Sequence, residues 1–126
     1  MTNLNRITLL GHLGQDPKTG STAAGKAVTR FSVATNTRYK DDEAQWKQST
    51  EWHNCVVYGA SAGYAARLSS GAFVFIEGEM TYHDFPREIE TQQGLVSVDW
   101  PMAEVVVSSL TAITPRGKTE QQESAA

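Results

Sequence analysis

Alternating apolar and polar side chains predict that most of this chain is strand. The clearest alternation lies in AVTRFSVATNTRY, residues 27–39. One set of alternate positions holds Thr29, Phe31, Val33 and Thr35, and the other holds Arg30, Ser32, Ala34 and Asn36. Because successive side chains of a strand point to opposite faces, this segment predicts a strand with one buried and one exposed face.

The remaining segments predict four more strands and one helix. The strands are expected in NRITLLGHL (5–13), TEWHNCVVYG (50–59), AFVFIEGEM (72–80) and MAEVVVSSLTAI (102–113), with loops at 18–26 and 40–49. The Ala-rich segment 60–70 has Tyr64, Ala65 and Leu68 at helical spacing, and Gly71 follows as a left-handed cap. Before the last strand, Gln93-Gly94 predicts the turn of an inserted hairpin.

This order of elements predicts a mainly all-β OB-fold, a five-stranded Greek-key barrel with one short helix between its third and fourth strands. An extended hairpin follows the fourth strand. The length of 126 residues fits one domain. We expect that domain to span residues 1–113 and a short, polar, disordered tail to span residues 114–126.

In the third predicted strand, TEWHNCVVYG, the aromatic side chains of Trp52 and Tyr58 lie on one side. Trp52, Asn54, Val56 and Tyr58 share one face, and His53, Cys55 and Val57 share the other. We expect the second face to lie in the barrel interior. The first face could pack under the helix or stay open for stacking something planar, and parity alone does not choose between these alternatives.

Composition and charge narrow the class of protein. The formal net charge of −3 argues mildly against nucleic acid, although 11 lysines and arginines can still gather on one face. The single cysteine, Cys55, allows no intramolecular disulfide and fits a reducing cytoplasm. The N-terminal residues lack the features of a signal peptide, and no segment is apolar enough to cross a bilayer. We therefore expect a soluble, cytoplasmic protein.

Catalytic chemistry has weak support in the sequence. His12, His53 and His83 lack metal-binding spacing, and GHLGQD lacks the strand-to-helix context of a phosphate-binding loop. Cys55 and His53 share a face and could pair as thiol and base, but a packed, inert cysteine is far more usual on an apolar face. We expect no enzyme activity, no cofactor and no metal, and we keep a thiol enzyme as an alternative.

Aromatic residues accompanied by cations are the more informative pattern. On or beside the second to fourth predicted strands lie Tyr39, Trp46, Trp52, Tyr58, Tyr82 and Phe85, with Arg38, Lys40 and Lys47 among them. Stacking of a base on an exposed ring contributes about 1 to 3 kcal/mol and tolerates any sequence. Nearby cations neutralise the phosphates that accompany the bases. This combination fits a surface that stacks bases, and the alternative is a set of packed rings beside a charged loop that is merely solvated.

Four segments resemble the bacterial single-stranded DNA-binding protein family. NRITLLGHLGQDP is similar to the family's first strand and turn, GKAVTRFSVATN to its second strand, TEWHNCVVYG to its third and FIEGEM to its fourth. The matches keep their order and spacing over residues 3–113. The resemblance implies an OB barrel, a homotetramer with a dimer as the other possibility, and sequence-independent binding of single-stranded DNA in replication, recombination and repair near the nucleoid.

The resemblance also implies roles for individual residues. The stacking positions of the family fall on Tyr39, Trp52, Tyr58 and Phe85. The resemblance therefore favours an open face for bases, formed by Trp52, Asn54, Val56 and Tyr58. Its phosphate-contacting positions fall on Arg6, Lys40 and Lys47, and Arg38 joins them because it lies among the aromatic residues. His53 falls near a subunit interface. No role follows for Trp46.

Two segments depart from the family pattern. The hairpin segment TYHDFPREIE is acidic, with Arg87 as its one fixed cation, so we expect it to bind phosphate weakly. Within it, Pro86 predicts a bulge or an edge position. The sequence ends in EQQESAA, without the acidic, Phe-tipped peptide that recruits partners in the family. An accessory OB-fold protein of the primosome type, acting mainly through protein contacts, is the alternative function.

Overall fold

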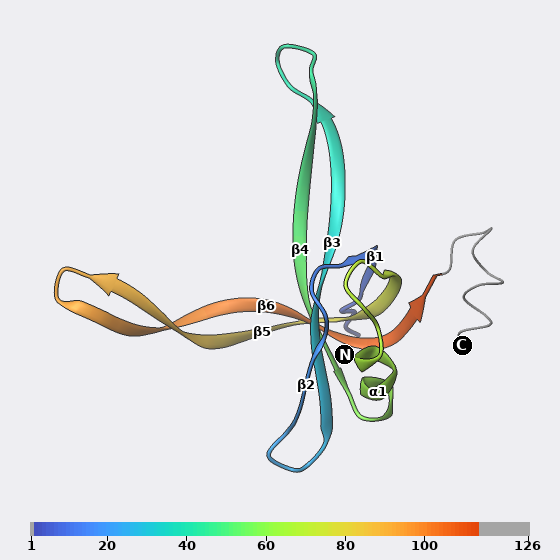
Figure 1. The fold of residues 1–126 in the computed structure, drawn as a ribbon, viewed down its shortest axis with the longest axis vertical. Coiled ribbons are helices and arrows are strands. Elements are labelled where there is room, and N and C mark those ends of the chain that lie inside the picture. The colour runs from blue at the N-terminus through green and yellow to red at the C-terminus, as the bar shows by residue number, and fades with distance from the viewer. Residues whose placement is uncertain (1, 114–126) are drawn as a thin grey trace.

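The computed structural model describes residues 2–113, so the tail predicted for residues 114–126 lies outside the described residues. The elements are β1 (Ile7–Leu13), β2 (Lys18–Ser21), β3 (Ala27–Lys40), β4 (Trp46–Tyr58), α1 (Ala60–Ala66), β5 (Phe73–Thr91) and β6 (Gly94–Ala112). Figure 1 shows a central barrel from which two long strand pairs project in different directions. No helix within residues 2–113 is long and apolar enough to span a membrane.

The barrel closes because β1 pairs with two strands. It pairs along Ile7 to His12 with β5 and, at its far end, with β3 through His12 and Leu13. The remaining pairings join β5 to β6, β6 to β4 and β4 to β3, with β4 and β6 running parallel. The predicted five-stranded OB-fold with a short helix before β5 is therefore confirmed.

Alternation along β3 fills the barrel core as predicted. Thr29, Phe31 and Val33 are buried, while Arg30 on the other face is exposed. The core cluster consists of Leu9, Leu13, Phe31, Val33, Cys55, Val57, Ala62, Ala65, Val74, Ile76 and Val105. The hydroxyl of Thr29 donates a 2.8 Å hydrogen bond to the carbonyl of Ala62 and ties α1 to the barrel.

Two glycines allow strands to approach closely. A Cβ atom on Gly11 would collide with the carbonyl oxygen of Ala34, where β1 turns from β5 towards β3. A Cβ on Gly78 would collide with the carbonyl of Val106, beside the irregular register of β5 and β6. Larger residues at these two positions would force neighbouring strands apart.

Several predicted boundaries were wrong. Residues 18–21 form the short strand β2, paired with β3, although their Gly/Ser/Thr-rich composition predicted a loop. The charged loop is only the turn between Lys40 and Trp46, so Trp46 and Lys47 lie in a strand. The helix ends at Ala66 rather than Ser70. Gly71 has the expected positive φ of 87°, but its N–H group bonds Leu13 on β1, so it closes a connection instead of capping the helix.

The predicted hairpin at Gln93-Gly94 is confirmed, and its strands are continuous with β5 and β6. Outside the barrel, we call residues 36–50 the β3–β4 arm and residues 82–102 the β5–β6 arm (Figure 1). Of the two alternatives predicted for Pro86, an edge position is confirmed and a bulge is not, because the register shift lies between Glu77 and Gly78. Pro86 pairs with Asp99 in a two-stranded arm, where its other side needs no ladder hydrogen bond.

Candidate nucleic-acid interface

Trp52 lies against the barrel on one side and is open to solvent on the other. A Cβ atom on Gly14 would lie 2.5 Å from Cζ3 and 3.1 Å from Cη2 of the indole, so the ring rests on the glycine backbone. The residue is nevertheless 58% exposed. This arrangement fixes the plane of the ring and leaves it available for stacking. The sequence marked Gly14 only as a turn former, so its contact with Trp52 was missed.

The face of β4 that carries Trp52, Asn54, Val56 and Tyr58 is not open along its whole length. Val56 is fully buried and Tyr58 is half-buried, so the predicted open platform of four residues was wrong beyond Asn54. The physical reason is that β4 gains a second neighbour where the barrel closes, so Val56 lies between Arg30 of β3 and Val106 of β6 on the same face of the sheet. Tyr58 keeps part of its ring exposed, whereas Trp52 and Asn54 remain at the surface.

The opposite face of β4 enters the core, as predicted for Cys55 and Val57. Burial, with a smaller contribution from Glu104, raises the pKa of the Cys55 thiol to about 12. The thiol contacts the carbonyl of His53 at 3.7 Å, and the imidazole instead shares a 2.9 Å hydrogen bond with the hydroxyl of Thr35. A protonated, buried thiol without a free base argues against the thiol enzyme.

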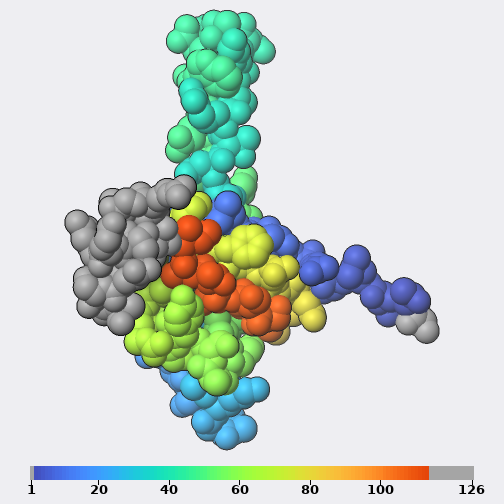
Figure 2. All heavy atoms as spheres, turned by 90° about the vertical axis from the view of Figure 1, so that its right-hand side faces the viewer, coloured from blue at the N-terminus to red at the C-terminus, as the bar shows by residue number. Residues whose placement is uncertain are grey.

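The β3–β4 arm gathers cations around one tryptophan. The guanidinium carbon of Arg38 lies 4.8 Å from the centroid of Trp46, and the ammonium of Lys40 lies 5.2 Å from it. Trp46 is 58% exposed. Trp46, for which the sequence indicated no role, therefore makes cation–π contacts with both cations at the surface. Figure 2 shows this arm standing clear of the barrel.

The other predicted arm residues lie on the opposite ladder face. Tyr39 pairs with Lys47, and neither shares a face with Trp46. Tyr39 is 49% exposed, and the ammonium of Lys47 lies 3.9 Å from a carboxylate oxygen of Asp41. The arm can therefore meet a strand on either face.

Arg6 lies apart from these arm residues. It precedes β1 beside Glu77, and its guanidinium lies 3.4 Å from that carboxylate. Both side chains of this pair remain accessible, which makes it weak and displaceable. The structure does not bring Arg6 to the β3–β4 arm.

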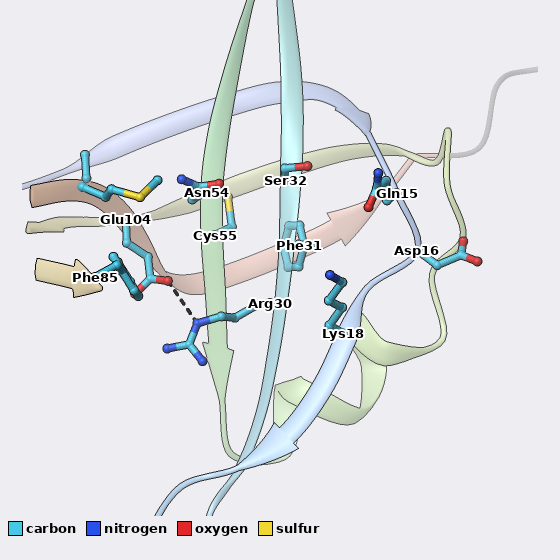
Figure 3. A pocket seen from close by; sticks show the side chains of 12 residues that line it. Gln15, Asp16, Lys18, Arg30, Phe31, Ser32, Asn54, Cys55, Phe85 and Glu104 are labelled. Atoms are coloured by element: carbon cyan, nitrogen blue, oxygen red, sulfur yellow. Dashed lines mark hydrogen bonds and ion pairs between the residues drawn. The ribbon is translucent and has the colours of Figure 1, made fainter. Parts of the chain in front are cut away.

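A cavity of about 410 Å³ opens between β2, β3, β4 and the base of the β5–β6 arm (Figure 3). Its lining includes the ring of Phe85, the predicted stacking residue, together with Phe31, Ser32, Asn54 and Met102. It also includes Gln15, Asp16, Lys18, Arg30, Cys55, Ala103 and Glu104. Sequence reasoning missed Lys18 and Arg30 here because β2 was read as a loop.

The remainder of the β5–β6 arm is acidic and carries exposed apolar residues. Arg87, its one fixed cation, lies 5.3 Å over the ring of Trp100. Tyr82 is 67% exposed on the same arm. Within residues 2–113, no three His, Cys, Asp or Glu side chains gather in a way that could hold a metal ion.

The model of the Single-strand binding protein family matches residues 4–109. The chain belongs to this family. The resemblance carried by its strand segments is thereby confirmed. Members of the family are therefore the appropriate comparison for its rings and cations.

Curated relatives carry matching names. The single-stranded DNA-binding protein of Xanthomonas campestris pv. campestris is 41% identical over 83 residues, which cover 65% of this chain and 48% of the relative. Single-stranded DNA-binding protein 1 of Chlorobaculum tepidum is 40% identical over 78 residues, covering 61% of this chain and 48% of the relative. The chain thus spans about half the length of the curated relatives it matches.

Solved structures support the same fold. A structure described as Plasmodium falciparum SSB in complex with ssDNA superposes with a TM-score of 0.71 and 26% identity, covering 90% of this chain and 98% of the other. A deletion mutant of the single-stranded DNA binding protein from Thermus aquaticus superposes with a TM-score of 0.70. Its identity is 22%, with 90% of this chain and 52% of the other covered, and it supports the fold alone.

Proposed function

We propose that this family member binds single-stranded DNA without sequence preference. The observation that carries the proposal is Trp52, whose ring rests on Gly14 and keeps its other face open near the cavity lined by Phe85. A ring held in one orientation loses little entropy when a base stacks on it. Since every base has a π-face, such a surface binds all sequences.

The stacking rings need not lie in one plane. Trp52 and Phe85 are near the barrel, Tyr39 lies on the β3–β4 arm, and Tyr58 offers only part of its ring. A flexible single strand can bend between them, because its unstacked bases turn independently. Each stacked base would contribute about 1 to 3 kcal/mol.

The cations complete the mechanism. Arg38 and Lys40 contact the ring of Trp46 and make no ion pair with any carboxylate of residues 2–113, which leaves them available to phosphates. Lys47 and Arg6 make exposed ion pairs of 3.9 Å and 3.4 Å, which a phosphate can replace at little cost. Each neutralised phosphate would steepen the salt dependence of single-strand binding by about 0.7 in the log–log slope.

The proposal includes a setting and an assembly. We infer a non-catalytic protein that protects and organises single strands during replication, recombination and repair in the cytoplasm, close to the nucleoid. A homotetramer with His53 near a subunit junction is part of the proposal. The half-buried position of His53 beside Thr35 supports a structural role for it. Neither the family nor the names of the relatives favour the primosome-type alternative.

The test is a titration of labelled dT oligomers of increasing length at two salt concentrations, with the mass of the complex measured alongside. We expect tight binding at low salt, a steep loss at high salt and weak binding to a duplex of equal length. Trp52→Leu should weaken binding about tenfold, while Trp52→Phe retains most of the affinity because it keeps a ring. Absence of binding at low salt, or binding without a salt slope, would refute the proposal. If Trp52→Leu instead dissociates the oligomer, the ring packs at an interface.

A further inference from the structure

Two cations face each other across β2 and β3. Lys18 and Arg30 are directly paired in the antiparallel register, and both residues are exposed. Like charges placed opposite each other on a sheet destabilise it. Lys18 and Arg30 also line the same cavity. An anion bound there would offset the repulsion between them.

Arg30 is held in position by a buried carboxylate. Its Nε atom lies 3.2 Å from Oε2 of Glu104, whose side chain is only 4% exposed, while the side chain of Arg30 is 51% exposed. Figure 3 shows Arg30 extended towards Glu104, next to Phe85. This contact uses the Nε–H group and leaves the two terminal nitrogens of the guanidinium for a ligand. Such a fork suits the paired oxygens of a phosphate.

Among the described residues that line the cavity, Glu104 is the one carboxylate that makes an ion pair with either cation. Oδ1 of Asp16 accepts a 2.8 Å hydrogen bond from the backbone N–H of Ser70, and Figure 3 shows this carboxylate turned away from Arg30. Oε1 of Glu104 has no hydrogen-bond partner within residues 2–113, and Nε2 of His83 lies 3.7 Å from it. Glu104 therefore orients one cation, while Lys18 makes no ion pair within the described residues.

The rest of the cavity suits the nucleotide that carries such a phosphate. Phe85 and Met102 offer apolar surface, and Ser32 and Asn54 offer polar groups at the wall. The volume of about 410 Å³ lies in the range of pockets that bind small ligands. A base on Phe85 would place its phosphate towards the exposed rim, where the two cations lie.

We propose that Lys18 and Arg30 form a seat for one phosphate of the bound single strand, with Glu104 as the positioning residue for Arg30. The proposal rests on the proposed function and adds a binding position to it. Because the seat contacts the backbone, its contribution is independent of base sequence. The proposal also predicts that the planar shape of the Arg30 guanidinium, and not only its charge, contributes to DNA affinity.

The first test compares Arg30→Gln, Arg30→Lys and Lys18→Gln with the wild type, using labelled dT and dC oligomers at pH 8. We expect each Gln variant to lose affinity about five- to tenfold and its salt slope to fall by about 0.7. Arg30→Lys should lose nearly as much affinity as Arg30→Gln, because lysine lacks the planar fork. Arg67→Gln, which removes an exposed cation at the end of α1, is the matched control and should bind as the wild type does.

The second test is a double-mutant cycle between Arg30 and Glu104. Glu104→Met removes the carboxylate at similar volume, and Glu104→Gln serves if the first variant unfolds earlier in a thermal melt. If Glu104 positions Arg30, then Arg30→Gln should cost less than about twofold in the Glu104 variant. An equal or larger loss in that background would mean that Glu104 only competes with the phosphate, and would overturn its positioning role.

The outcomes of these tests distinguish failure of the phosphate seat from failure of the proposed function. If the wild type binds dT and the Arg30 and Lys18 variants match it, the seat is refuted and the proposed function stands. A loss confined to one base would mean that Arg30 contacts a base edge instead, which also overturns the seat. If the wild type itself fails to bind, the proposed function is wrong.

Discussion

Replacing Gly14 by alanine tests whether the glycine sets the position of Trp52. The new Cβ would lie 2.5 Å from Cζ3 of the indole and 3.0 Å from the hydroxyl oxygen of Ser32. Ordinary carbon contacts are about 3.5 to 4.0 Å, so the ring must move outwards by about 1 to 1.5 Å. Gly14 does not have a left-handed backbone, and alanine is therefore free of backbone strain there.

The displaced ring should bind DNA less well while the barrel stays folded. Trp52 is 58% exposed, so moving it disturbs little buried surface. Losing about half of a stacking contribution of about 1 to 3 kcal/mol corresponds to roughly 0.5 to 1.5 kcal/mol. We therefore expect Gly14→Ala to weaken binding of dT oligomers about two- to twelvefold by fluorescence anisotropy, because 1.4 kcal/mol is a factor of ten.

The control separates this effect from a general effect of removing a glycine. Gly20→Ala places its Cβ at an ordinary 3.8 Å from Val28 and should leave binding unchanged. In a Trp52→Leu background, Gly14→Ala should cause no further loss, since the ring it displaces is gone. Unchanged affinity of Gly14→Ala, or an equal loss with and without Trp52, would show that the glycine does not position the ring.

Three further predictions concern the arm, the core and the helix. Trp46→Ala should weaken DNA binding about two- to threefold by anisotropy, because Arg38 and Lys40 lose the ring that holds them; unchanged binding would contradict this role. The folded pKa of Cys55 is raised from 9.0 to about 12. The unfolded thiol therefore loses its proton first, and stability falls above pH 9, by about 1.4 kcal/mol at pH 10. In urea unfolding at pH 8 and pH 10, the free energy of unfolding of Cys55→Ala should therefore fall less than that of the wild type. An equal fall in the two proteins would contradict the prediction. Gly63→Ala, whose Cβ meets nothing within 4 Å, should raise stability by about 0.5 to 1 kcal/mol in urea without changing DNA affinity; destabilisation would indicate a hidden contact.

The sequence predicted the barrel well where local patterns coincide with tertiary ones. The alternation along β3 predicted its buried face correctly from Thr29 to Val33, although Val28, on the face of Arg30, is also buried. Alternation failed in β4, where Val56 is buried on the face predicted to be open. The cause is a parallel contact with Val106 on β6, which lies 50 residues further along the chain and leaves no local signal.

The candidate site shows the same limit. Stacking roles for Trp52 and Phe85 could be predicted from the sequence because the stacking positions of the family fall on these two residues. The contact of Trp52 with Gly14 and the pair of Arg30 with Glu104 could not, since each depends on strands meeting across the barrel. Arg30 and Glu104 are 74 residues apart, and only the closed barrel brings them together.

The net charge of −3 is compatible with DNA binding because the acidic excess lies on the β5–β6 arm, while the β3–β4 arm has as many cations as carboxylates. The β5–β6 arm holds Asp84, Glu88, Glu90 and Asp99 against Arg87 alone. On the β3–β4 arm, the carboxylates stand at the turn, where Asp41 accepts hydrogen bonds from the backbone N–H groups of Glu43 and Gln45. Arg38 and Lys40 contact the ring of Trp46 instead of these carboxylates. A strand that avoids the acidic arm would run from these cations past Trp52 into the cavity, so local placement of charge, and not its total, governs binding.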